Sequence, residues 1–110
     1  MVLLDNGKVL IASGRGSPDD YHKLCYLYDP VANTWSAPGS NSQSHNNGRG
    51  DNFVKLPNGK ILISAGEALI AQGATNECEV YDPTTGAWSA AAVYPGGKRS
   101  HLSCALLPNG

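Results

Sequence analysis

The sequence predicts an all-β protein made of repeated hairpin units, and three observations carry this prediction. Residues 4–14 return as residues 56–66 with seven of eleven positions identical, a repeat period typical of stacked β units. In both copies an Asn-Gly dipeptide lies between two apolar runs, which is the strongest short-range signal for a β-hairpin. No segment shows the spacing of about 3.6 residues between apolar side chains that indicates an amphipathic helix.

The first hairpin of each unit is expected to be short and tight. In the second copy, residues 53–56 and 60–65 form its two strands, which are joined through Asn58 and Gly59. We expect a type I′ turn there, with positive φ at both central residues. Gly66 is then the point at which the second strand ends and the backbone leaves the sheet.

A second repeated block predicts a second hairpin in each unit. Residues 25–30 return as residues 78–83, and Trp-Ser-Ala follows each block. In the second copy, strands over 77–81 and 88–90 flank an Asp-Pro-Thr-Thr-Gly turn, in which Pro presets φ and Gly permits a left-handed corner. The first copy has Asp-Pro-Val-Ala-Asn in the same role, and a third copy of the repeat opens at 107–110.

Aromatic and cysteine side chains recur at fixed positions of the repeat. We interpret Tyr28, Trp35, Tyr81 and Trp88 as core residues that pack one unit against the next, rather than as a surface for stacking a ligand.

The three cysteines are expected to be buried apolar residues. Cys25 and Cys78 are equivalent, and equivalent positions on neighbouring units lie too far apart for a disulfide. Cys104 stands in a different element, and the spacing of the three matches no zinc pattern.

These blocks resemble the kelch repeat, in the form found in bacterial and galactose-oxidase-like propellers. The matching features are Leu-Pro-Asn-Gly-Lys before an apolar strand that ends in Ala-Gly, then Tyr-Asp-Pro with Trp seven residues after the Tyr. Arg99 and His101 resemble the Arg-x-x-His opening of the family's first strand, one residue tighter than usual. Arg49 matches without a His, and the family's Gly-Gly is reduced to Ser-Gly and Ala-Gly. The resemblance covers nearly the whole chain.

The resemblance implies β-propeller blades of the kelch type: two four-stranded blades plus the first strand of a third. We expect the first blade over 1–37, with its first strand truncated, and a long loop over 38–52. The second blade covers 53–90, and 91–110 hold a loop and the first strand of the next blade.

Two blades alone leave two apolar faces bare, and closed propellers have about 4–8 blades. The missing blades come either from a longer chain or from other copies of this chain, assembled head to tail as a homo-oligomer. Three copies would give six blades. The sequence leaves both arrangements open.

Composition excludes some partners. A net charge of -1 gives no pull toward nucleic acid or a membrane surface, and no apolar run is long enough to span a bilayer. The first residues lack the features of a signal peptide, so either the protein is not secreted or that segment is missing.

The long connections are expected to gather on one side of the blades and to carry any binding function. They cover 15–24, 67–76, 38–52 and 91–98, whereas the other turns are short. A protein or carbohydrate ligand is the expected partner on this long-loop face. The candidate binding residues are Asp19, Asp20, Tyr21, His22, Arg49, Asp51, Arg99 and His101.

No catalytic or metal-binding constellation is expected. Asp19, Asp20 and His22 match no known metal-ligand spacing, and the Arg49-Gly50-Asp51 tripeptide is read as a chance match to an integrin-binding motif. The sequence therefore predicts a non-catalytic kelch propeller module for binding or structural assembly, without a cofactor. The alternative is a fragment of a galactose-oxidase-like or other propeller enzyme whose catalytic residues lie outside this chain.

Overall fold

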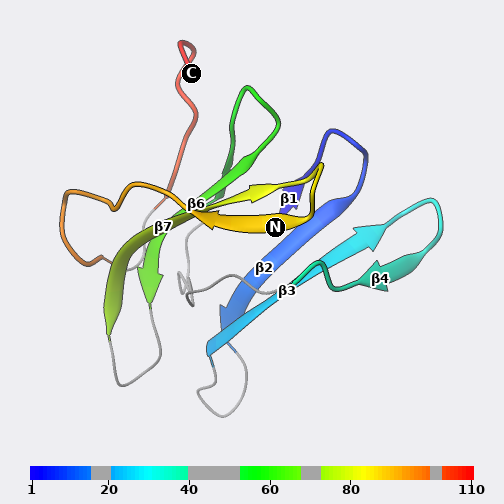
Figure 1. Ribbon diagram of the computed structural model, residues 1–110, viewed down its shortest axis with the longest axis horizontal. Helices are drawn as coiled ribbons and strands as arrows, with labels where there is room; N and C mark the ends of the chain where they lie inside the picture. The colour runs from blue at the N-terminus through cyan, green and yellow to red at the C-terminus, as the bar shows by residue number, and fades with distance from the viewer. Residues whose placement is uncertain (16–20, 40–52, 68–72, 100–102) are drawn as a thin grey trace.

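The computed structural model describes residues 1–15, 21–39, 53–67, 73–99 and 103–110. These residues form two four-stranded antiparallel sheets and no helix (Figure 1). The predicted all-β class and the four-stranded units are thus confirmed. The strands of the first sheet are β1 (Val2–Leu3), β2 (Val9–Arg15), β3 (Tyr21–Asp29) and β4 (Thr34–Ser36). Those of the second are β5 (Phe53–Lys55), β6 (Ile61–Glu67), β7 (Ala74–Asp82) and β8 (Ala87–Ala90).

Both sheets have the same order and the same register. Each strand pairs with the next along the chain, so each sheet is an up-and-down meander. Leu10 faces Leu27 in the first sheet as Leu62 faces Val80 in the second. Because these pairs are equivalent in the repeat, the two copies fold alike down to the residue pairing.

The turn between β5 and β6 differs from the predicted type I′ turn. Gly59 N donates to Leu56 O at 2.9 Å and Leu56 N donates to Lys60 O at 2.8 Å. Gly59 has a φ of 79°, whereas Asn58 is not among the residues with positive φ. This is a type I turn followed by a left-handed glycine, the usual three-residue hairpin loop. Pro57 favours it, because the proline ring fixes φ near the value that the first turn position requires.

The long strands extend further than predicted. Gly66 does not end β6: beyond a bulge between Ser64 and Gly66, it pairs with Thr75. A bulge adds one residue and turns the strand without ending the ladder. The first sheet repeats this feature, so Tyr21 and His22 belong to β3 and not to a loop. The connections at this end are correspondingly shorter than expected.

The two sheets pack face to face. We call the face that carries the Tyr-Trp pair the front face, and the opposite one the back face, following the alternation of side chains along a strand. The back face of the first sheet meets the front face of the second, and β1 lies beside β5. The shared core consists of Leu4, Leu10, Ala12, Cys25, Ile61 and Tyr81.

The two Tyr-Trp pairs have different surroundings. Tyr81 and Trp88 lie 5.2 Å apart between ring centroids, and Tyr81 is 1% exposed in the core. Tyr28 and Trp35 lie 5.0 Å apart, but Trp35 is 57% exposed. The prediction of a core role is therefore confirmed for the second pair and wrong for the first within this chain. The reason is that no other sheet of the described residues covers the front face of the first sheet.

The predicted first strand of a third unit is not formed by residues 103–110. A strand is defined by a hydrogen-bonded partner, and no described segment pairs with these residues. The turn at their end does form: Gly110 N donates to Leu107 O at 2.9 Å and Gly110 has a φ of 84°. The turn thus forms from its local sequence, although the hairpin that it would join is not formed by the described residues.

Candidate binding site

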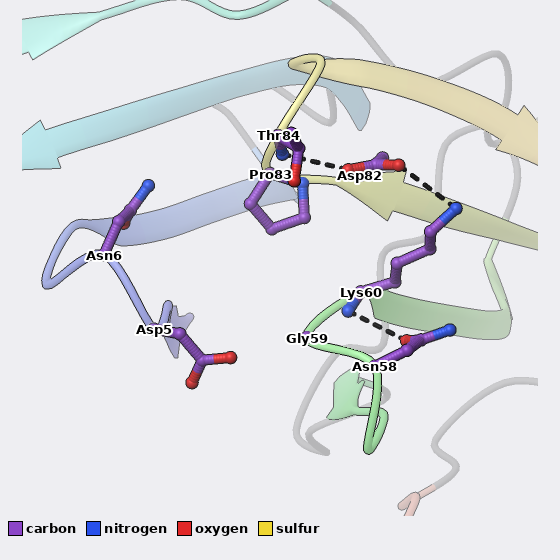
Figure 2. A pocket seen from close by; sticks show the side chains of 8 residues that line it. All are labelled: Asp5, Asn6, Asn58, Gly59, Lys60, Asp82, Pro83 and Thr84. Atoms are coloured by element: carbon purple, nitrogen blue, oxygen red, sulfur yellow. Dashed lines mark hydrogen bonds and ion pairs between the residues drawn. The ribbon is translucent and has the colours of Figure 1, made fainter.

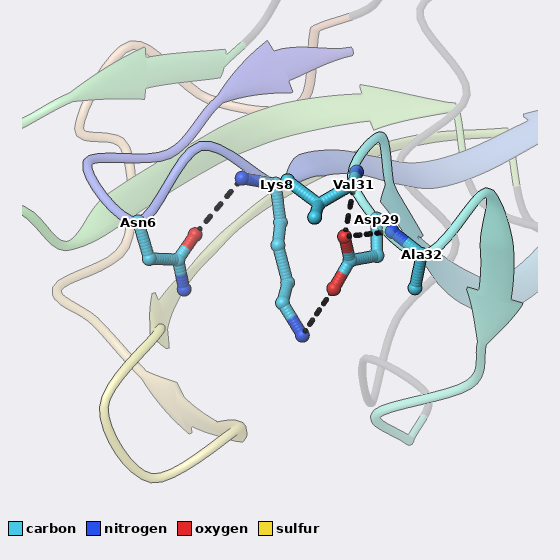
Figure 3. A network of polar contacts seen from close by, with 5 residues as sticks. All are labelled: Asn6, Lys8, Asp29, Val31 and Ala32. Carbon is cyan, nitrogen blue, oxygen red and sulfur yellow. Dashed lines mark hydrogen bonds and ion pairs between the residues drawn. The ribbon is translucent and has the colours of Figure 1, made fainter.

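A repeated polar network ties together the short turns at one end of each sheet. Asp29 accepts hydrogen bonds from the backbone N–H groups of Val31 and Ala32, both at 3.0 Å (Figure 3). Lys8, next to the first turn, reaches the same carboxylate at 3.3 Å. Backbone bonding from Ala32, followed by the bond from Lys8, lowers the pKa of Asp29.

The second sheet repeats this network. Thr84 N donates to Asp82 Oδ1 at 2.9 Å, and Lys60 Nζ lies 3.1 Å from Asp82 Oδ2. The pKa of Asp82 is lowered, first by the backbone bond from Thr84 and then by the Lys60 bond. The Asn-Gly-Lys and Tyr-Asp-Pro motifs thus act together. The lysine of the first turn forms an ion pair with the aspartate that accepts the backbone hydrogen bonds of the second turn.

A pocket opens between the two sheets at this same end. Its volume is about 350 Å³, and Figure 2 shows the turns of both copies around it. It is lined by Asp5, Asn6, Asn58, Gly59, Lys60, Asp82, Pro83 and Thr84.

The chemistry of the pocket is polar, and its charged groups already have partners. Lys55 Nζ lies 2.6 Å from Asp5 Oδ1, and Lys60 is paired with Asp82. Asn58 Oδ1 accepts from Lys60 N at 3.1 Å. The described residues contain no group of three or more His, Cys, Asp or Glu side chains that could hold a metal ion. The charged side chains that line the pocket are thus engaged in ion pairs.

Of the predicted binding residues, Arg99 is the one whose side chain is described. It lies at the opposite end of the second sheet, where its backbone forms a bridge to Thr75 and its O accepts from Gly66 N at 3.0 Å. The exposed guanidinium donates through Nε to Gly96 O at 3.3 Å. The backbone of Arg99 thus forms hydrogen bonds with the bulged end of β6 and β7, and its side chain is exposed to solvent.

The other predicted residues are only partly placed. The backbones of Tyr21 and His22 pair with Arg15 and Gly14 at the end of the first sheet that corresponds to the position of Arg99 on the second. The remaining five candidates fall outside the described residues: Asp19, Asp20, Arg49, Asp51 and His101.

The polar pocket at the short-turn end was not predicted. A signal in the sequence accompanies these residues, since Asn-Gly-Lys and Asp-Pro recur in the same order in both copies, with one extra residue between them in the second. What the sequence could not supply is the packing of one sheet on the other, which brings Asp5 of the first copy beside Lys55 and Gly59 of the second.

The cysteines form no disulfide, as expected. Cys25 and Cys78 are buried, which confirms their predicted role, while Cys104 is half-buried. Cys104 Sγ and Ser64 Oγ lie 2.7 Å apart in a hydrogen bond. This contact holds the C-terminal segment against the back face of the second sheet.

No protein-family model matches the chain, and no curated protein is significantly similar to it. In the described ranges, no helix is long and apolar enough to cross a membrane.

Proposed function

We propose that this chain is a pair of kelch-type β-propeller blades that acts as a non-catalytic module for binding or structural assembly. The proposal treats each four-stranded sheet as one blade, with β1 and β5 as the innermost strands and β4 and β8 as the outermost. It rests on how the repeated segments are placed relative to one another.

The observation that carries the proposal is the position of the third copy. Cys104 corresponds to Phe53 in the repeat and Ser64 to Ala12. Cys104 contacts Ser64 on the second sheet, and Phe53 packs against the cluster that contains Ala12 on the first.

The turn of each copy also lies beside the turn of the preceding copy in the same way. A Cβ built on Gly59 would lie 3.0 Å from Asp5 Oδ2, and one built on Gly110 would lie 3.6 Å from Pro57 Cγ. Gly110 is equivalent to Gly59, and Pro57 is equivalent to Asp5. Each copy is therefore placed on the previous one by a similar step, and repetition of one step is how propeller blades are arranged around an axis.

We further propose that recognition takes place at the end of the blades that holds Arg99, Tyr21 and His22. At the opposite end, the charged groups of the turns are engaged in the pairs Lys8–Asp29, Lys60–Asp82 and Lys55–Asp5. The exposed guanidinium of Arg99 lies beyond these networks. A protein or a carbohydrate offers the hydrogen-bond acceptors that such a face would bind.

Tandem fusion tests the blade arrangement. Because 107–110 match 4–7, a second and a third copy can each continue from Gly110 at Lys8 without breaking the repeat. Three fused units should give one compact, disc-shaped particle by small-angle X-ray scattering, with a higher unfolding temperature than one unit. A matched fusion that continues at Val9 shifts the register by one residue and should lose both properties, since a one-residue slip reverses the two faces of a strand.

An extended, bead-like particle from the in-register fusion would contradict the proposal. If the two fusions gave the same particle shape and the same unfolding temperature, the copies would not continue the stack of sheets.

A further inference from the structure

The pair of sheets has two outer faces. Each of them is equivalent, in the repeat, to one side of the interface between the two sheets. The front face of the first sheet lies open, and it is equivalent to the front face of the second, which is buried. The back face of the second sheet is equivalent to the buried back face of the first; no described sheet covers it, although Cys78 on it is 7% exposed and the segment 103–110 contacts Ser64. Each open face therefore has a known counterpart within the chain.

The match extends to individual residues of the core. The buried front-face residues Ile61, Ile63 and Tyr81 correspond to Val9, Ile11 and Tyr28 on the open front face. Two of these three pairs are identical and the third exchanges Ile for Val, whereas the buried Glu79 of the same face corresponds to Tyr26.

The back faces match equally well. The residues that receive Tyr81 are Leu4, Leu10, Ala12 and Cys25. Their equivalents on the second sheet are Leu56, Leu62, Ser64 and Cys78. Three of the four are identical, and the fourth differs by one hydroxyl group.

We propose that the open front face of the first sheet binds the open back face of the second sheet of another copy of this chain. This inference rests on the proposed blade arrangement and names its partner. The contact is heterologous, because two different faces meet, so each chain uses one face for each neighbour. Copies therefore add head to tail until a ring closes.

A paired change at the rim supports a second copy as the occupant. Inside the chain, Lys55 of the second sheet meets Asp5 of the first at 2.6 Å. The equivalents of these residues on the open faces are Leu3 and Pro57. Both charges are thus replaced together, and an apolar pair would stand where the internal interface has an ion pair. Leu106 of the C-terminal segment is likewise equivalent to Lys55 in the repeat, so the pair stays apolar when this segment takes the place of β1.

The segment 103–110 already lies at the edge of the open back face, where it contacts Ser64 and approaches Pro57. A docked copy would bring its own β1 to the same place. The segment therefore takes the position of the partner's β1 on the partner's β2, where it gains the antiparallel pairing that it lacks in the single chain.

Complementation between two variants tests the proposal on the 110-residue chain. Ile11→Lys places an unpaired charge on the front face, and Leu62→Lys places one on the back face. Sedimentation equilibrium of the unchanged chain, from low micromolar to near-millimolar concentrations, should show association beyond one chain. Each variant alone should associate at least about tenfold more weakly, and an equimolar mixture should give a one-to-one heterodimer, since one intact face of each kind is left.

Val31→Lys is the matched control, because Val31 is 96% exposed on a turn away from both faces, and it should associate like the unchanged chain. Circular dichroism checks that each variant retains its β structure, and the heterodimer itself reports that both variants are folded. A chain that stays monomeric at all concentrations, or a mixture that stays monomeric while the unchanged chain associates, overturns the proposal. If the fused units still form a compact disc in that case, the self-association fails and the proposed blade arrangement stands.

Discussion

The ammonium group of Lys60 lies 3.1 Å from the carboxylate of Asp82 and joins the turn between β5 and β6 to the turn between β7 and β8. Lys8 and Asp29 repeat this pair at 3.3 Å in the first sheet. Both aspartates also accept backbone hydrogen bonds, and these bonds are the first cause of their lowered pKa values.

Acid should weaken the fold through these two aspartates. A carboxyl group whose pKa is lowered on folding stabilises the protein fully above its unfolded pKa of about 3.9, and this contribution is lost as pH falls through the lower folded pKa. The double variant Asp29→Asn, Asp82→Asn keeps an acceptor for the turn N–H groups but cannot titrate. Its urea midpoint should fall less steeply than that of the unchanged chain below about pH 4. Equal slopes for the two proteins would refute this assignment.

Equivalent tyrosines should differ in their effect on stability. Tyr81→Ala removes a side chain that is 1% exposed in the core and should cost about 3–5 kcal/mol of unfolding free energy. Tyr28→Ala removes the same residue type at the same place of the repeat, where no sheet covers it, and should cost about 1 kcal/mol. Urea unfolding at concentrations too low for association measures both values. A Tyr28→Ala cost equal to that of Tyr81→Ala would show that the first front face is covered in the single chain.

Much of this fold follows from local signals in the sequence. Asn-Gly between apolar runs and Asp-Pro before Trp specify hairpins through contacts of a few residues, and all four hairpin turns form where expected. The turn at 107–110 forms even without its hairpin, which shows how local this information is.

Features that depend on distant residues were not predictable in the same way. The continuation of β6 through Gly66 depends on pairing with Thr75 beyond a bulge, and nothing in the residues around Gly66 specifies that partner. Likewise, Tyr28 and Tyr81 both stand in a Cys-x-x-Tyr-Asp-Pro block, and the packing of whole sheets buries Tyr81 while it leaves Tyr28 half-buried. The polar pocket has the same origin, since it exists only where two sheets meet.

The glycines of the first turn in each sheet, Gly7 and Gly59, provide a test of how closely the turns approach one another. Gly7 and Gly59 have φ values of 80° and 79°, so alanine at either position should cost about 1 kcal/mol in backbone strain. A Cβ at Gly7 meets nothing within 4 Å, whereas one at Gly59 lies 3.0 Å from Asp5 Oδ2.

Gly59→Ala should therefore be the more destabilising of the two in thermal or urea unfolding. The difference should vanish when Asp5→Ala is added, because Asp5 is the group that is crowded. If the two glycine variants stay equal in the presence of Asp5, the turns of the two copies do not meet as described.

The final prediction concerns β1 and the C-terminal segment, which compete for one place in the proposed assembly. β1 is held to β2 by two residue pairs, Val2 with Leu10 and Leu3 with Val9. Residues 103–107 are long enough to pair along more of β2, so they should displace β1 of the neighbouring copy. Deleting residues 1–3 then removes a competitor, and association measured by sedimentation equilibrium should be unchanged or stronger. Deleting residues 103–110 removes the replacing strand and should weaken association at least about tenfold. The opposite result, in which loss of residues 1–3 abolishes association and loss of residues 103–110 strengthens it, would mean that β1 stays in place and the C-terminal segment is the one that leaves.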